Sequence, residues 1–178
     1  MTELRVLLLP GWLDSGPEHW QSRWERLHGD QRVQQSDWRW PKRGDWMARL
    51  EEVLLERETP ALLVAHSLGC HLVTAWAAHS RHTARVRGAL LVALPDIERE
   101  DMPPNLQPWR PILRARLPFP AIAVTSLDDP FSSPERGQAL ALDWGAEAVS
   151  IGAAGHINGE SGLGDWPVGR ALVDRLRG

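Results

Sequence analysis

Short apolar runs without polar alternation are the feature that most limits the fold of this 178-residue chain. The clearest of these runs are Leu4–Leu9, Ala61–Ala65, Gly88–Ala93 and Ala121–Thr125. A strand with one wet face alternates apolar and polar residues, so continuous runs favour strands covered on both faces, which means a parallel sheet. Weaker runs at Arg32–Gln35 and Ala146–Ile151 bring the expected sheet, mostly parallel, to about six strands.

Helix signals lie between these runs. Two Ser-x-x-Glu spacings, Ser15–Glu18 and Ser132–Glu135, predict capping boxes, and Asp45 and Asp165 are expected to open two further helices. The apolar faces expected for these helices include Trp20, Trp24, Leu27, Trp46, Leu50, Val168 and Leu172. Strands that alternate with helices predict an α/β fold, a three-layer α/β/α sandwich with right-handed crossovers, and residues 1–178 are expected to form one domain.

The segment 94–120 departs from this alternation, since it holds seven of the fourteen prolines. We expect a surface excursion with one short helix around Trp109–Leu117. Two interpretations stay open for it. It is either an irregular connection or a short cap over a site, because long loops in compact domains often serve as lids.

Composition and charge exclude several classes of function. The net charge of −3 offers no electrostatic footprint for nucleic acid. Cys70 is the one cysteine, so neither an intramolecular disulfide nor a cysteine-rich zinc site is available. The run Leu4–Leu9 is too short for a signal peptide or a membrane span. From this and the single cysteine we expect a cytoplasmic protein. With no glycine-rich phosphate loop and no His-Glu-x-x-His pattern, we expect no metal or cofactor.

The stretch 62–76 carries the clearest chemical signal. An apolar strand ends near Ala65 and an apolar helix begins at Leu68, with Ala65-His-Ser-Leu-Gly69 between them. This small-x-Ser-x-small pattern is typical of a nucleophile elbow, where a strained turn lifts the serine hydroxyl above the sheet edge. The Leu68 N–H would then be one oxyanion donor. The alternative is that Ser67 merely caps a buried helix.

A serine in an elbow needs an acid and a base, which follow it in the order Asp or Glu, then His. Asp128 and Asp129 come directly after the run Ala121–Thr125, and Asp129 fits the expected position better. Either aspartate could instead only shape the turn. His156 follows the last strand on a glycine-bearing loop, which lets it reach the serine. Packing or solvent is expected for the other histidines, although His19 could border the pocket.

The loop after the first strand, Leu9-Pro-Gly-Trp12, is expected to supply the second oxyanion donor from the Trp12 N–H. Gly11 would let the backbone approach a substrate. Ten tryptophans against two phenylalanines and no tyrosine suggest that some indoles line a ligand pocket. Five indoles lie in loops near the expected sheet edge: Trp12, Trp38, Trp40, Trp109 and Trp166. Among them, we expect Trp38 and Trp109 to contact the substrate.

These motifs resemble those of the α/β-hydrolase superfamily, and within it the small serine hydrolases grouped with YdeN and retinoblastoma-binding protein 9. The resemblance rests on Pro10–Trp12, Gly16–Trp20, Ala65–Gly69, Ser126–Phe131 and Ala154–Asn158. It implies a compact, nearly lidless hydrolase with a triad of Ser67, Asp129 and His156. Ala65 departs from the pattern, since many relatives carry glycine there.

The sequence therefore predicts a serine hydrolase that cleaves a small carboxylic ester through an acyl-enzyme. Its partner would be a small acyl substrate, with no nucleic acid and no membrane. The competing hypothesis is a protein-binding module that keeps the hydrolase fold and uses its tryptophan-rich loops and 94–120 as the surface. A cysteine nucleophile at Cys70 is a weaker alternative, because Cys70 lies inside the expected helix.

Overall fold

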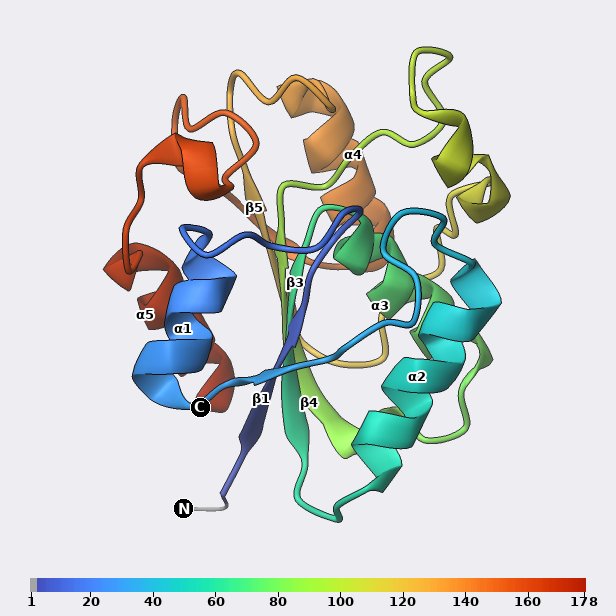
Figure 1. Ribbon diagram of the computed structural model, residues 1–178, viewed down its shortest axis with the longest axis vertical. Coiled ribbons are helices and arrows are strands. Elements are labelled where there is room, and N and C mark those ends of the chain that lie inside the picture. Colours follow the sequence, from blue (N-terminus) through green and yellow to red (C-terminus); the bar gives the residue numbers. More distant parts are fainter. Residues whose placement is uncertain (1–2) are drawn as a thin grey trace.

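A computed structural model describes residues 3–178 of the chain and shows a sheet at its centre (Figure 1). The strands are β1 (Arg5–Leu9), β2 (Gln31–Arg32), β3 (Ala61–His66), β4 (Val86–Val92), β5 (Ala121–Thr125) and β6 (Glu147–Ser150). All six pair in parallel, in the order β2-β1-β3-β4-β5-β6. The predicted parallel sheet is confirmed, and each strand overlaps its predicted run.

Helices cover both faces of the sheet (Figure 1). The α-helices are α1 (Trp20–His28), α2 (Arg43–Leu55), α3 (Leu68–His79), α4 (Pro134–Trp144) and α5 (Pro167–Arg177), and short 3₁₀ helices span Thr83–Arg85, Pro104–Trp109 and Gly159–Ser161. Helices α1 and α5 bury one face of the sheet, and α2, α3 and α4 bury the other. The predicted three-layer sandwich is confirmed. Between residues 3 and 178, no helix is both long and apolar enough to cross a bilayer.

Six tryptophans are among the largest fully buried side chains, namely Trp20, Trp24, Trp46, Trp76, Trp109 and Trp144. Each places its ring in the core while its indole N–H donates to a carbonyl or carboxylate oxygen. The bonds often join a helix to a distant loop. Trp20 donates to the Ile157 carbonyl at 2.8 Å, and Trp144 to the Leu113 carbonyl at 2.8 Å. The indoles thus connect the irregular segments to the layers.

Several predicted helix starts are wrong. Helix α1 is capped by His19, whose Nδ1 accepts from the Gln21 N–H, because a turn at Gly16 delays the helix beyond Ser15. Asp45 lies inside the first turn of α2, where its charge favours the positive end of the helix dipole without capping it. Two other predicted helix-face residues are exposed, Leu27 at 55% and Val168 at 58%.

The α4 capping residue is also shifted by one position. Ser133, rather than Ser132, accepts from the Arg136 N–H. Pro134 takes the first helical position, where its fixed φ and missing N–H are tolerated, so the residue before it becomes the cap.

The segment 94–120 runs along the surface with many exposed residues, but it is anchored in the core at several points. Its short helix spans Pro104–Trp109 instead of Trp109–Leu117. Seven apolar residues of the segment are buried in the core on the side of α2, α3 and α4: Leu94, Ile97, Leu106, Trp109, Ile112, Leu117 and Phe119. The prolines shape an irregular path, while these side chains bind it to the body of the protein.

The close packing of α3 against the end of β1 restricts the conformation of the turn between β3 and α3. A Cβ added at Gly69 would overlap the Leu9 carbonyl oxygen and lie 3.2 Å from the Pro10 carbonyl oxygen. Both obstacles are backbone atoms, which cannot rotate away. The small residue that the elbow pattern requires after the serine therefore has a direct physical reason here.

We expect Gly69→Ala to destabilise the fold. Alanine normally favours a helix over glycine by about 0.5–1 kcal/mol. At this position the overlap with Leu9 should reverse that gain and lower the free energy of unfolding by about 1–3 kcal/mol. Urea unfolding measures the change. Gly16→Ala is the matched control, because a Cβ there meets no atom within 4 Å. Equal midpoints for Gly69→Ala and the wild type would contradict this account.

Candidate active site

Ser67 occupies a strained turn between β3 and α3. Its φ of 55° and ψ of −123° lie in a region that residues with side chains rarely adopt. The Ser67 N–H donates to the Val92 carbonyl at 2.9 Å, which ties the turn to the end of β4. The hydroxyl is thereby held at the carboxyl edge of the sheet, where ligands of α/β proteins gather.

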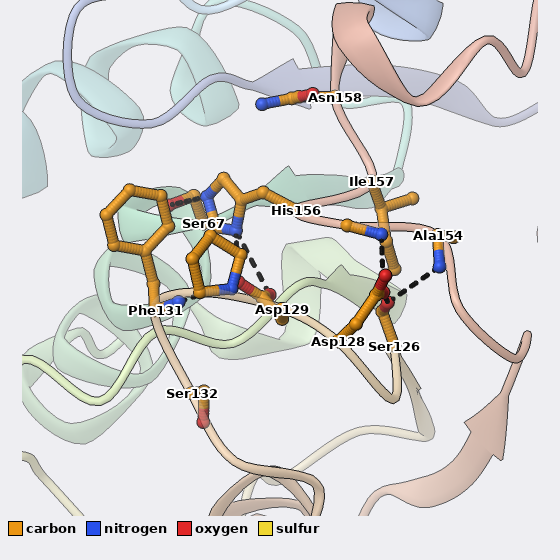
Figure 2. A network of polar contacts seen from close by, with 12 residues as sticks. Ser67, Ser126, Asp128, Asp129, Phe131, Ser132, Ala154, His156, Ile157 and Asn158 are labelled. Carbon is orange, nitrogen blue, oxygen red and sulfur yellow. Dashed lines mark hydrogen bonds and ion pairs between the residues drawn. The ribbon is translucent and has the colours of Figure 1, made fainter.

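The structure brings Ser67, Asp129 and His156 into contact (Figure 2). His156 Nε2 lies 2.9 Å from Ser67 Oγ, and His156 Nδ1 lies 3.0 Å from both Asp129 oxygens. A carboxylate only accepts, so the ring proton belongs on Nδ1 and Nε2 is free to accept from the serine hydroxyl. The side chains of His156 and Asp129 are only 10% and 4% exposed, which strengthens their electrostatic interaction.

The two neighbouring aspartates have different partners (Figure 2). Asp129 faces the imidazole and also accepts from the Phe131 N–H at 2.9 Å. Asp128 faces the loop before His156 and accepts from the Gly155 N–H at 2.8 Å and the Ser126 hydroxyl at 2.9 Å. The Gly155 bond, with that of Ser126, holds the pKa of Asp128 below its usual value. Of the two candidates, Asp129 is the one in contact with His156.

Aromatic rings surround the imidazole of His156. The Phe131 ring lies edge-on to it with centroids 4.6 Å apart, and the His66 ring does so at 4.8 Å. His66 Nε2 donates to the His156 carbonyl at 2.8 Å. His19 packs behind His66 at 4.5 Å. Burial lowers the pKa of His19 to about 3 and that of His66 well below its usual value, so both rings stay neutral at pH 7.

A cavity of about 220 Å³ opens above Ser67 and His156. Its walls include Trp12, Leu13, Pro95, Met102, Leu106 and Phe131. Among residues 3–178, the amide N–H groups of Trp12 and Leu68 donate to no protein acceptor, and both residues line this cavity. Two free donors beside a serine hydroxyl are the arrangement that an oxyanion hole requires.

Gly11 lies against the elbow and is absent from the cavity wall. A Cβ there would come within 2.9 Å of Ser67 Cβ and 3.1 Å of the Leu68 nitrogen. The missing side chain therefore keeps one candidate oxyanion donor accessible. This is a different role from the substrate contact that the sequence suggested.

The structure places neither Trp38 nor Trp109 on the cavity wall, which corrects their predicted contact with substrate. Trp109 is buried, packs on Trp46 with centroids 5.3 Å apart and donates to the Pro41 carbonyl. Trp38 also packs edge-on against Trp46, with ring centroids 5.3 Å apart. Both follow strands, but their rings turn into the α2 side of the core, because so large an apolar surface gains more there.

Sequence reasoning missed the wall residues Met102 and Leu106. Both lie in the segment 94–120, which thus contributes part of the cavity wall. Apolar residues inside a proline-rich segment were the signal that could have identified them.

Cys70 is fully buried, and burial raises the pKa of its thiol. A neutral thiol without access to the cavity is a poor nucleophile. In the described part of the chain, no three His, Cys, Asp or Glu side chains gather in a way that could hold a metal ion.

A serine hydrolase family profile matches residues 6–175. This chain belongs to the serine hydrolase family. A YdeN-like hydrolase of Pectobacterium atrosepticum is 31% identical, with 98% of this chain and 90% of that chain covered and a TM-score of 0.85. The ydeN gene product of Bacillus subtilis is 21% identical, with 98% of both chains covered and a TM-score of 0.72.

More distant structures share the fold of this serine hydrolase. A Bacillus cereus carboxylesterase is 15% identical, with 99% of this chain and 90% of that chain covered and a TM-score of 0.64. None of the curated proteins is similar enough to this chain to count as a match. The α/β-hydrolase resemblance expected from the motifs is confirmed at the level of family and fold.

The buried His19 should make this serine hydrolase less stable in mild acid. Its pKa falls from 6.5 in the unfolded chain to about 3 in the fold, so only the unfolded chain takes up the proton between these values. Stability then rises with pH across this window, by about 2 kcal/mol between pH 5 and pH 7 for this one group. His19→Asn keeps an acceptor for the helix cap and should remove that difference.

Urea unfolding of the wild type and His19→Asn at both pH values measures the effect. His28→Asn is the control, because it replaces an exposed histidine of the same helix. If His19→Asn retains the full wild-type difference between pH 5 and pH 7, the neutral buried ring is not its source.

Proposed function

We propose that this serine hydrolase cleaves small carboxylic esters by transferring the acyl group first to Ser67 and then to water. The observation that carries the proposal is the 2.9 Å contact between His156 Nε2 and Ser67 Oγ, with Asp129 on the other ring nitrogen. A hydroxyl, an imidazole and a carboxylate in this order form a nucleophile with its base and an orienting acid.

In the first step, Ser67 Oγ attacks the ester carbonyl carbon and His156 Nε2 accepts the hydroxyl proton. Asp129 keeps the other ring proton on Nδ1 and stabilises the imidazolium. The carbonyl oxygen becomes an oxyanion that accepts from the Leu68 and Trp12 N–H groups, each donor contributing about 3 kcal/mol. The carbon–oxygen bond to the alcohol then breaks, and His156 returns its proton to the leaving oxygen.

In the second step, water replaces the alcohol. His156 Nε2 accepts a proton from the water as its oxygen attacks the acyl carbon of the Ser67 ester. The bond from that carbon to Ser67 Oγ breaks, and the proton passes from His156 to the serine oxygen. The carboxylic acid leaves and the free hydroxyl is restored.

The cavity above Ser67 supports a small apolar acyl group as the preferred substrate part. Its volume is about 220 Å³, with apolar side chains such as Met102 and Leu106 on its walls. An apolar cavity of about 150 Å³ is known to hold one benzene molecule. The site therefore suits a short aliphatic chain or one aromatic ring, while a long acyl chain would have to extend into solvent.

Ser67→Ala should abolish labelling by a fluorophosphonate probe, because the probe reacts only with an activated hydroxyl. Ester hydrolysis should fall by a factor on the order of 10⁶, as in other serine triads. In-gel fluorescence and nitrophenyl ester assays measure the two effects. Ser80→Ala is the matched control, since that hydroxyl bonds to Glu51 far from the cavity. Persistent labelling of Ser67→Ala would refute Ser67 as the nucleophile.

Turnover should be higher for short-chain than for long-chain nitrophenyl esters, because the cavity is small. Leu106→Ala removes part of the wall and should raise the octanoyl-to-butyryl ratio of kcat/KM by roughly tenfold. Leu142→Ala is the control, as that leucine is 78% exposed on α4. An octanoyl preference in the wild type, or an unchanged ratio in Leu106→Ala, would contradict this placement of the acyl group.

A further inference from the structure

The loop that carries His156 must cross much of the sheet. It leaves the edge strand β6, while Ser67 follows β3, which lies three strands away. Neighbouring strands are about 4.8 Å apart, so the loop has to bring the imidazole back across roughly 14 Å. The crossing is irregular, with φ values of 78° at Gly152, 56° at Gly155 and 51° at Ile157. Such a path needs support from outside the loop.

Buried groups support the downstream side of the loop. His66 Nε2 donates to the His156 carbonyl at 2.8 Å, and the Trp20 indole donates to the Ile157 carbonyl at 2.8 Å. The Ile157 side chain is fully buried against the α1 and α5 layer. The backbone at His156 and Ile157 is therefore held by the core.

The upstream side is held by the turn after β5 (Figure 2) and by Ser161 Oγ, which donates to the Ala154 carbonyl at 2.7 Å. The Ala154 N–H donates to Ser126 Oγ at 2.9 Å, and the Gly155 N–H donates to Asp128 Oδ1 at 2.8 Å. Ser126 Oγ in turn donates to Asp128 Oδ1 at 2.9 Å. Two consecutive amides immediately before His156 are thus held by side chains from the turn that also carries Asp129.

Within residues 3–178, the side chain of Asp128 contacts mainly the loop before His156 and its own turn. It is exposed, and between residues 3 and 178 it forms no ion pair with any lysine, arginine or histidine. Its side-chain hydrogen bonds go to Gly155 and Ser126. Hydrogen bonds to a carboxylate are shorter and about twice as strong as those between neutral groups. This gives the Gly155 amide a strong anchor at a point where the core offers none.

We propose that Asp128 is a positioning residue, which holds the Gly155 amide and thereby sets the place of the His156 imidazole between Ser67 and Asp129. The inference rests on the proposed catalytic role of His156. A misplacement of about 1 Å in a catalytic group can lower the rate by about 10²-fold. The two adjacent aspartates then have separate roles. Asp129 binds the imidazole of His156, and Asp128 holds the backbone amide of the residue before it.

The test compares the same substitutions at the two aspartates. Asp128→Ala removes the acceptor and should lower kcat by roughly 10- to 100-fold with KM unchanged, because substrate contacts are intact. Asp128→Asn keeps an oxygen that can accept from the Gly155 N–H and should stay within about threefold of the wild type. Asp129→Asn should lower kcat by about 10⁴-fold, because the amide favours the wrong tautomer of His156.

Two measurements separate positioning from a loss of folded protein. Titration of active sites with the fluorophosphonate gives kcat per reactive serine. The proton resonance of the His156 Nδ1–H reports its hydrogen bond to Asp129, and it should shift or broaden in Asp128→Ala but not in Asp128→Asn. Asp174→Ala, which removes an exposed carboxylate of α5, is the control that should match the wild type in both.

The outcomes distinguish this inference from the proposed function. Wild-type kcat and an unchanged resonance in Asp128→Ala, together with inactive Asp129→Asn, would overturn the positioning role alone. Full activity in Asp129→Asn would overturn the triad on which it rests. If Asp128→Ala does not fold, Asp128→Glu takes its place. It keeps the charge but displaces the acceptor by one methylene, so an unchanged kcat there would also overturn the positioning role.

Discussion

The contact between the first turn of α3 and the end of β1 determines the geometry around Ser67, on which the rest of the site converges. Gly69 has no room for a Cβ against the Leu9 carbonyl, and Gly11 has little against Ser67. With the helix held so close, the chain leaves β3 through a left-handed residue, and Ser67 takes a φ of 55°. The same contact leaves the Leu68 amide at the cavity, where no other protein group accepts its proton within residues 3–178.

The parallel sheet then determines which residues can meet. All carboxyl ends of parallel strands lie at one edge, so residues after β3, β5 and β6 share a rim although they are far apart in the chain. A shared position at this rim does not by itself align the side chains of Ser67, Asp129 and His156. The loop after β6 needs the Ser126–Asp128 turn on one side and His66 with Trp20 on the other before the His156 imidazole has a defined place.

Local patterns predicted the strands well because a strand buried on both faces is a continuous apolar run in the sequence, as in Ala61–Ala65 and Ala121–Thr125. They failed where neighbours distant in sequence decide the outcome. Ser15 has the spacing of a helix cap, but its hydroxyl bonds to the Gln21 side chain, which is held by the Val64 carbonyl of β3, and His19 takes the cap. Trp109 has the position of a pocket residue, but Trp46 and the Pro41 carbonyl draw its indole into the core.

Local sequence was enough to predict the succession of strands and helices along the chain, the elbow around Ser67, and an acid and a histidine after later strands. Each of these depends on residues close together in the chain. The contact of Asp129 with His156, the contact of Asp128 with Gly155 and the place of Leu106 at the cavity became evident only from the folded chain. Adjacent aspartates carry the same local signal. The partner of each aspartate lies 27 residues further along the chain, so only the packing of the loops after β5 and β6 distinguishes the role of Asp128 from that of Asp129.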